Sequence, residues 1–128
     1  MNDRSIKKLQ LLKQSKHRRT ENQFLAEGKR LVEEAINYSS TVELIFCTQT
    51  FYNRNKNDWQ GFPKVKNTMI QIITDSQFKR ISSTSTPSGI AALCNVPINH
   101  YIDFKESEWI YLDKIRDPGN LGTILRSA

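Results

Sequence analysis

The chain has few of the residues that build metal sites or disulfide frameworks. Its 128 residues include two cysteines and two histidines. Cys47 and Cys94 each lie in an apolar run, and neither is clustered with His17 or His100 as the ligands of a metal site would be. We therefore expect two buried, reduced thiols, no metal, and a protein of the cytoplasm.

Long hydrophobic runs are also lacking. No apolar stretch approaches the roughly 18 residues that a membrane span needs. The first 19 residues contain no continuous apolar segment of the kind found in secretory signals. The hydrophobic share of 38% and the charged share of 25% are typical of a globular protein. The length is enough for one domain with a core and too short for two full domains.

Acidic residues are scarce at the front of the chain. Residues 1–30 contain nine Lys/Arg and three Asp/Glu, a surplus of six positive charges. The other 98 residues contain ten of each, so the whole net charge of +6 comes from the first 30 residues. Such a basic patch favours a polyanionic partner such as RNA, because phosphate neutralisation releases counterions. The alternative is a solvated helix face that carries charge for solubility.

Apolar periodicity predicts alternating helices and strands. We expect helices at 6–19 (capped by Ser5), at 29–39, early in 48–67, and at 77–82 (capped by Asp75 or Ser76). We expect an extended segment at 21–27 and strands at 42–47, 69–74, 89–96 and 109–115. Strands and helices that alternate in this way predict α/β layers around a mainly parallel sheet.

A polar stretch at 95–108 is the expected internal boundary. It divides the chain into a first domain at residues 1–100 and a segment at 101–128. The segment holds a linker, a strand and the start of a helix. One strand without a partner cannot form a sheet alone, so we expect the second domain to continue beyond Ala128.

The turn DPGN precedes the last expected helix. Pro118 presets a turn residue, Gly119 tolerates positive φ, and Asn120 is suited to cap the helix or to present its amide outward. The Arg126 guanidinium is long enough to reach back toward a ligand at the helix start. Taken alone, these residues also fit an ordinary link between a strand and a helix.

Three stretches in order carry a family resemblance: FLAEGKRLVEEAI, STPSGIAAL and DPGNLGTILRSA. Together they resemble the SpoU-type RNA ribose 2′-O-methyltransferases of the SPOUT class, over nearly the whole chain. The resemblance implies a three-layer α/β/α RNA-binding domain similar to ribosomal and kink-turn-binding proteins. The truncated start of a trefoil-knot methyltransferase domain would follow it.

The resemblance also implies chemistry for the last segment. Asn120 and Arg126 match the first catalytic motif, in which they would place the ribose and phosphate of the substrate. A guanidinium is a poor base but stabilises a developing alkoxide, and the methyl donor would be S-adenosylmethionine. The cofactor-binding residues and a homodimer interface are expected beyond Ala128. We therefore predict that these 128 residues alone neither bind the cofactor nor methylate RNA.

The predicted RNA-binding residues combine basic side chains with a hydroxyl-rich loop. They are Arg18, Arg19, Glu27, Lys29, Arg30, Thr86, Ser88 and Gly89. For Glu27 the alternative is a structural acid near a helix N-terminus, and for Ser88 and Gly89 it is a loop that closes onto a strand. The aromatic rings of Tyr52, Trp59 and Phe62 could stack on bases or pack internally.

Three functions therefore compete. The leading one is RNA recognition within a ribose 2′-O-methyltransferase, with 23S ribosomal RNA as the expected substrate. The second is a stand-alone RNA-binding module of ribosomal-protein-like fold. A nucleotide-binding protein that uses GNLG as a phosphate turn is the weakest, because neither a P-loop nor a G-x-G-x-x-G pattern is present.

Overall fold

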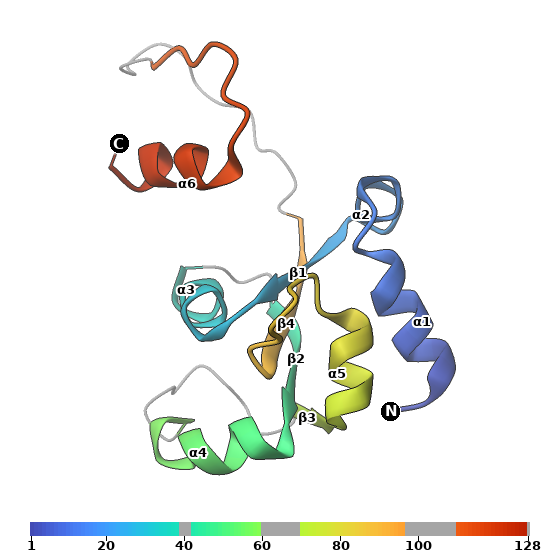
Figure 1. Ribbon diagram of the computed structural model, residues 1–128. Coiled ribbons are helices and arrows are strands. Elements are labelled where there is room, and N and C mark those ends of the chain that lie inside the picture. The colour runs from blue at the N-terminus through green and yellow to red at the C-terminus, as the bar shows by residue number, and fades with distance from the viewer. Residues whose placement is uncertain (39–41, 60–69, 97–109, 128) are drawn as a thin grey trace. The chain divides into compact units, whose positions relative to one another are not determined.

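The computed structural model describes residues 1–38, 42–59, 70–96 and 110–127. The chain divides into two compact units, residues 1–98 and 99–128. The elements of the first unit are α1 (Asp3–Leu11), α2 (Ser15–Glu21), β1 (Gln23–Glu27), α3 (Lys29–Tyr38), β2 (Val42–Thr48), α4 (Gln49–Trp59), β3 (Ile70–Ile73), α5 (Asp75–Ile81) and β4 (Ile90–Asn95) (Figure 1). The second unit contains α6 (Pro118–Ser127). No helix in the described ranges is long and apolar enough to cross a membrane.

The four strands form one mixed sheet with the order β1-β4-β2-β3. β4 is antiparallel to both β1 and β2, and only β2 and β3 are parallel neighbours. The prediction of a mainly parallel sheet is therefore wrong. The cause lies between β3 and β4, where α5 rises only about 10 Å over its seven residues. After this short helix, the loop 82–89 returns the chain to the end of the sheet at which β3 finishes. β4 begins at that end and therefore runs in the opposite direction.

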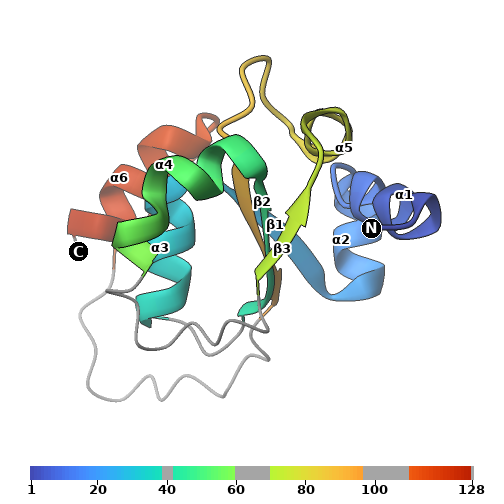
Figure 2. The same cartoon turned by 90° about the horizontal axis from the view of Figure 1, so that it is seen from below.

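Helices cover both faces of the sheet, which confirms the three-layer α/β/α arrangement. On one face, α1 and α5 pack through Ile6, Leu9 and Phe78 against Phe46 and Leu93. The opposite core cluster joins Val32 and Ile36 of α3 to Ile45 and Ala92 of the sheet, with Phe51 and Tyr52 of α4 packed against it. Figure 2 shows α3 and α4 on one side of the strands and α1, α2 and α5 on the other. The packing of Tyr52 supports an internal role for this ring. The Trp59 side chain and Phe62 lie outside what the structure describes.

The N-terminal helix differs from the prediction in two ways. It begins earlier, because Asn2 rather than Ser5 is the cap: Asn2 Oδ1 accepts a hydrogen bond of 2.8 Å from the Ser5 amide. The single helix expected at 6–19 is broken after Leu11 into α1 and α2. The apolar stripe of Ile6, Leu9 and Leu12 ends at the break, and α2 has no buried residue. Because α2 has no apolar stripe that faces the core, packing does not keep it collinear with α1.

Other boundaries shift by one or a few residues. The cap of α5 is Thr74, not Asp75 or Ser76. It forms a reciprocal capping box in which Thr74 Oγ1 accepts from the Gln77 amide and Gln77 Oε1 accepts from the Thr74 amide. The helix expected at the start of 48–67 is present and extends over 11 residues. The strands expected at 42–47, 69–74 and 89–96 and the helix at 29–39 are confirmed in their described residues.

The strand expected at 109–115 is not formed in its described residues. Residues 110–117 have neither helix nor strand structure, and Ile110 and Tyr111 are 64% and 90% exposed. The apolar run WIYL has strand propensity, but a strand needs a paired neighbour to satisfy its backbone. The described part of this unit supplies none.

Candidate nucleic-acid interface

Three separate segments meet at one end of the sheet. β1 and β2 are both antiparallel to β4, so their carboxyl ends lie beside the beginning of β4. The register shows this directly, since Glu27 pairs with Ala91 and Cys47 pairs with Ile90. The turn 27–30, the start of α4 after Thr48, and the hydroxyl-rich loop 82–89 are thereby brought together. We call this arrangement the loop end of the sheet.

Glu27 anchors the loop 82–89. Its carboxylate accepts hydrogen bonds from Ser82 Oγ at 2.5 Å, from the Ser83 amide at 2.9 Å and from Thr84 Oγ1 at 3.2 Å. Hydrogen bonds to an ionised acceptor are stronger than neutral ones. The structure therefore gives Glu27 a structural role, but with the loop rather than with a helix N-terminus, and sequence spacing alone could not reveal partners 55 to 57 residues away.

Gly89 closes the loop onto the sheet. Its φ of +81° lies in the region that side chains disfavour. A Cβ at this position would stand 3.0 Å from Thr48 Oγ1 and 3.2 Å from Phe51 Cβ. The Gly89 carbonyl accepts from the Thr48 amide at 2.9 Å, and Ser88 Oγ donates to the Ile90 carbonyl at 3.1 Å. This geometry supports the reading in which the Ser88 hydroxyl and Gly89 fix the end of the loop.

Lys29 and Arg30 stand at the same end with exposed side chains. Lys29 Nζ lies 3.2 Å from Asn55 Oδ1 and 4.0 Å from Glu33 Oε1, and Arg30 Nε lies 3.1 Å from Glu34 Oε1. The side chain of Arg30 is 78% exposed. An exposed pair such as that of Arg30 with Glu34 contributes little to stability, so the Arg30 guanidinium can exchange its acidic partner for a phosphate at low cost. Thr86 is also exposed in this region.

Arg18 and Arg19 lie elsewhere. They belong to α2, which precedes β1, so they lie toward the other end of the sheet. Arg18 Nη1 donates to the Leu12 carbonyl at 3.0 Å and to the Lys13 carbonyl at 2.7 Å, which caps the carboxyl end of α1. The eight residues predicted to bind RNA are therefore not one patch. Six are at the loop end, and the two arginines are at the opposite end.

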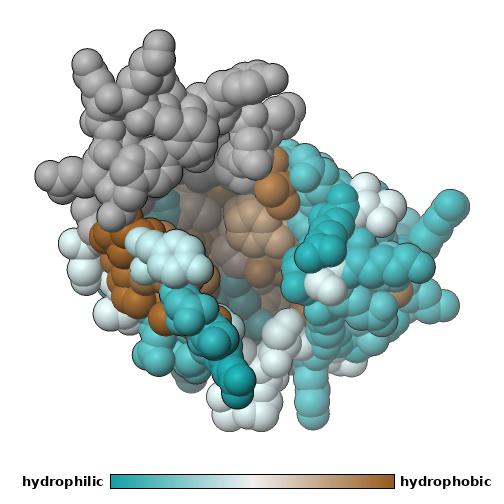
Figure 3. Space-filling view, turned by 90° about the horizontal axis from the view of Figure 1, so that it is seen from above, coloured by the Kyte–Doolittle hydropathy of each residue, from teal (hydrophilic) through white to brown (hydrophobic). Residues whose placement is uncertain are grey.

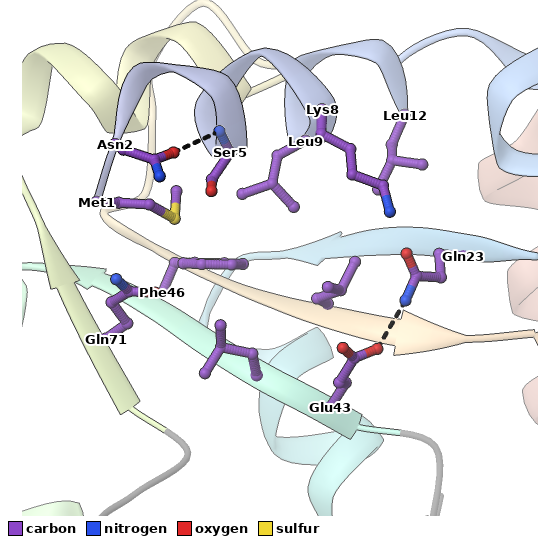
Figure 4. A pocket seen from close by; sticks show the side chains of 12 residues that line it. Met1, Asn2, Ser5, Lys8, Leu9, Leu12, Gln23, Glu43, Phe46 and Gln71 are labelled. Atoms are coloured by element: carbon purple, nitrogen blue, oxygen red, sulfur yellow. Dashed lines mark hydrogen bonds between the residues drawn. The ribbon is translucent and has the colours of Figure 1, made fainter. Parts of the chain in front are cut away.

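A groove between α1 and the sheet contains residues that the sequence reasoning missed. It has a volume of about 400 Å³, and Figure 4 shows its lining side chains. Lys8 of α1 faces Gln23 and Glu43 of the strands, and Gln23 Nε2 donates to Glu43 Oε2 at 2.6 Å. Gln71 comes from a third strand. Because these polar groups come from elements far apart in the sequence, no local pattern signals them.

In the second unit, Asn120 and Arg126 occupy α6. Asn120 is not the cap: its backbone amide donates to Asp117 Oδ1 at 2.8 Å, so Asp117 caps the helix and Pro118 takes the first helical position. Arg126 Nη2 lies 3.4 Å from Thr123 Oγ1. Both side chains are exposed, and Arg126 Nη1 would lie 3.4 Å from a Cβ at Gly122.

The cysteines lie in the core and not at a site. Both are buried, and burial raises the pKa of the Cys47 thiol to about 11 and also raises the pKa of Cys94. At neutral pH they are therefore protonated, poor nucleophiles and poor ligands. Among the described residues no three His, Cys, Asp or Glu side chains are grouped as a metal site would require.

Comparison with known proteins gives one consistent result. The family model described as the MRM3-like substrate binding domain matches residues 3–92. The chain is 31% identical to the 23S rRNA (guanosine(2553)-2′-O)-methyltransferase RlmP of Bacillus subtilis, over 98% of this chain and 47% of that protein. It is 26% identical to the mitochondrial rRNA methyltransferase 3 of Homo sapiens, over 92% of this chain and 29% of that protein.

Solved structures agree with these relatives. A crystal structure of an RNA 2′-O ribose methyltransferase matches 98% of this chain and 48% of its own length, with a TM-score of 0.74 and 25% identity. A putative RNA methyltransferase of the TrmH family from Porphyromonas gingivalis matches 99% of this chain with a TM-score of 0.67 and 28% identity. The chain spans about half or less of the length of the proteins that it matches. These relatives confirm the resemblance to SpoU-type methyltransferases, and the chain belongs to the family of MRM3-like substrate binding domains.

Proposed function

We propose that this chain recognises RNA for a ribose 2′-O-methyltransferase that modifies ribosomal RNA, with 23S rRNA as the substrate class. The observation that carries the proposal is the loop end of the sheet. There, Lys29 and Arg30 lie beside a loop of hydroxyls and backbone amides that Glu27 and Gly89 hold in place. The relatives named as rRNA methyltransferases supply the reaction class.

The loop end matches the chemistry of an RNA backbone. Lysine and arginine neutralise phosphates, while exposed hydroxyls and amides contact phosphate and the ribose 2′-hydroxyl. In this proposal Thr86 presents such groups, Lys29 and Arg30 supply charge, and Ser88 and Gly89 keep the loop in place. Glu27 acts indirectly by positioning the loop, since its acceptors already bind Ser82, Ser83 and Thr84.

The second unit would contribute to catalysis. A ribose hydroxyl is a weak nucleophile at neutral pH, and Arg126 would stabilise its developing negative charge or orient the adjacent phosphate while Asn120 helps to place the ribose. S-adenosylmethionine would supply the methyl group. The described residues of this unit do not fit that cofactor by themselves, because Asn120, Leu121, Leu125 and Arg126 are exposed and an adenosyl group needs an enclosed, largely apolar site.

The finer features implied by the resemblance are part of the same proposal. The first domain would share its fold with ribosomal and kink-turn-binding proteins, and residues 101–128 would open a trefoil-knot catalytic domain. That domain would hold the cofactor and form a homodimer. The protein would act in the cytoplasm.

Charge removal at the loop end tests RNA recognition. The Lys29→Ala/Arg30→Ala double variant should bind a 23S rRNA fragment about tenfold more weakly and lower the salt slope by about two. Lys79→Ala, an exposed cation on α5, is the control and should bind nearly as the parent chain does. Fluorescence anisotropy at several salt concentrations measures both. If the double variant and Lys79→Ala lose the same binding affinity, the loop end is not the RNA interface.

Calorimetry with S-adenosylmethionine separates recognition from catalysis. The 128-residue chain should show no binding heat at micromolar to millimolar cofactor. Micromolar binding would mean that the cofactor site lies within these residues, contrary to the proposal. A stand-alone RNA-binding module would share this result, so methyl transfer to the rRNA fragment by the protein that carries the chain decides between the two.

A further inference from the structure

A cleft lies beside α2, at the opposite end of the sheet from the loop end. Its volume is about 380 Å³, and it is lined by Ser15, Arg18, Arg19, Asn22, Phe24 and Val96. Its residues adjoin the start of β1 and the end of β4, which pair through Gln23 and Asn95. We call it the α2 cleft.

Asn22 builds one wall of the cleft. It adopts a left-handed conformation with φ of +53°, which ends α2 and turns the chain directly into β1. Its carbonyl accepts from the Val96 amide at 2.8 Å, and its Nδ2 donates to the Val96 carbonyl at 3.4 Å. The paired backbone on both sides of the turn makes this wall a fixed surface.

The cleft carries positive charge that no acid of the described residues neutralises. Arg18 donates to the backbone carbonyls of Leu12 and Lys13, and no carboxylate of the described residues forms an ion pair with it. Arg19 is exposed and has no ion pair within the described part of the chain. Glu21, the only acid of α2, is paired with Lys8 at 3.0 Å. The surface over α1 and α2, at the right of Figure 3, consists mostly of hydrophilic side chains.

Phe24 shares the lining of the cleft with these arginines. Phe24 is half-buried and packs partly against the core cluster of α3, yet it also lines the cleft. Guanidinium groups that bind phosphate next to an aromatic ring that stacks on bases are the usual elements of a site for unpaired nucleotides. Ser15 and Asn22 add short polar side chains to the lining.

We propose that the α2 cleft binds an unpaired nucleotide of the RNA, with its phosphate at Arg19 and its base against Phe24. This inference rests on the proposed function, since it assigns a second contact to the same RNA. Arg18 holds α2 against α1 and is a positioning residue. The sequence had placed both arginines in one patch with Lys29 and Arg30, and the structure gives them a separate site.

The separation of the two sites sets the size of the RNA. The five residues of β1 lie between them and extend about 17 Å at about 3.4 Å per residue. A stacked strand that rises about 3.4 Å per nucleotide covers this distance in about five steps, so about six stacked nucleotides reach both ends. Oligouridine of four nucleotides should therefore bind much more weakly than one of twelve.

Binding of fluorescein-labelled dodecauridine to the 128-residue chain tests the cleft. Phe24→Leu, which keeps an apolar side chain, should weaken binding about tenfold because it removes stacking, whereas Phe24→Tyr should bind as the parent does. Arg19→Ala should weaken binding several-fold and lower the salt slope by about one. Arg4→Ala removes the same charge from an exposed position outside the cleft and should have at most a third of that effect. A fully paired 12-base-pair RNA should not respond to Phe24→Leu.

Several results would overturn the inference. If Phe24→Leu binds dodecauridine as tightly as Phe24→Tyr does, no base stacks on Phe24. If Arg19→Ala and Arg4→Ala weaken binding equally, the RNA responds to the overall charge of the chain and not to the α2 cleft. Anionic phosphatidylglycerol vesicles that bind with the same response to Phe24→Leu would indicate a membrane surface instead. If the Lys29/Arg30 double variant loses binding while the cleft variants do not, this inference fails and the proposed function stands. If the parent chain binds no RNA, both fail. Thermal melting of each variant verifies folding.

Discussion

The two units of the chain carry similar local signals and reach different degrees of packing. In the first unit, Ile45 and Ala92 are completely buried between two layers of helices. In the second, Leu125 is 67% exposed and α6 has no buried residue in its described part. Both units contain an apolar helix stripe and capped helix starts. The difference shows that capping and periodicity define where a helix begins, whereas burial against a partner surface makes it stable.

This difference divides the proposed functions too. The loop end is held by long-range hydrogen bonds to Glu27 and by the close approach of Gly89 to Thr48, so it exists before RNA arrives. In the described residues, the contacts of Asn120 and Arg126 lie within α6 and its cap, Asp117. Recognition can therefore be preorganised in the first unit, while the catalytic candidates depend on further packing to acquire a defined geometry.

The largest expected difference between the units is in the effect of replacing one leucine by alanine in each of them. Leu93→Ala, in the central strand β4 with 8% exposure, should lower the free energy of unfolding by about 3 kcal/mol, because the cavity cannot refill. Leu125→Ala should change it by less than about 0.5 kcal/mol. Urea denaturation followed by circular dichroism gives both values. Similar losses would mean that α6 is packed as tightly as the sheet.

A second pair compares glycines. Gly89→Ala forces a Cβ into a positive-φ position against Thr48 and Phe51, and should cost about 1–3 kcal/mol of unfolding free energy. Gly122→Ala adds a Cβ within a helix, where the nearest atom is Arg126 Nη1 at 3.4 Å. It should stabilise α6 by about 1 kcal/mol, seen as greater helicity of this segment by NMR chemical shifts. A neutral Gly89→Ala would show that the loop closes in another way.

The sequence predicted most elements because their signals are local. The strand of Ile45 and the helix of Val32 and Ile36 follow from periodicity, and the family was evident from three motifs. The turn expected at DPGN is instead the start of α6, in which Pro118 is the first helical residue. The direction of β4 was missed because it depends on the length of α5 and the path of the loop 82–89. The strand at 109–115 was predicted from propensity alone, which carries no information about a pairing partner.

The candidate site was predicted residue by residue but not in its grouping. Lys29, Arg30, Thr86, Ser88 and Gly89 lie at one end of the sheet, as the proposed RNA-binding role would require. Arg18 was assigned to the same surface because basic residues near one another in sequence look like one patch. Its actual partners are the carbonyls at the end of α1, and a break in the helix at that point had no clear signal. Phe24 was passed over because an apolar residue in a strand is usually read as core.

The third test concerns how the loop end is preorganised. Glu27→Gln keeps the shape but weakens three hydrogen bonds to the loop, and should lower the free energy of unfolding by about 1–2 kcal/mol. Glu34→Gln, which breaks only an exposed pair with Arg30, should cost about 0.5 kcal/mol or less. Hydrogen exchange at the Ser83 amide should accelerate in the first variant only. Unchanged exchange there would contradict the anchoring role of Glu27.

The smallest expected effect is electrostatic and also differs between the units. A hydrogen bond from Arg80, 2.6 Å from Asp3, lowers the pKa of the Asp3 carboxyl below its ordinary value of 3.8, aided by the charges of Arg80 and Lys7. Because the pKa of Asp3 is lower in the folded state than in the unfolded state, its ionised carboxylate stabilises the fold at pH values above the unfolded-state pKa. This stabilisation is lost as the pH falls through the folded-state pKa. Asp3→Asn should therefore melt slightly below the parent chain at pH 7, and the difference should shrink below pH 3.8 and vanish once Asp3 is protonated in the fold. Asp113→Asn, which removes an exposed pair with Lys114 in the second unit, should leave the melting temperature unchanged at every pH. Calorimetric scans between pH 7 and pH 3 test both, and a constant difference for Asp3→Asn would show that charge is not the cause.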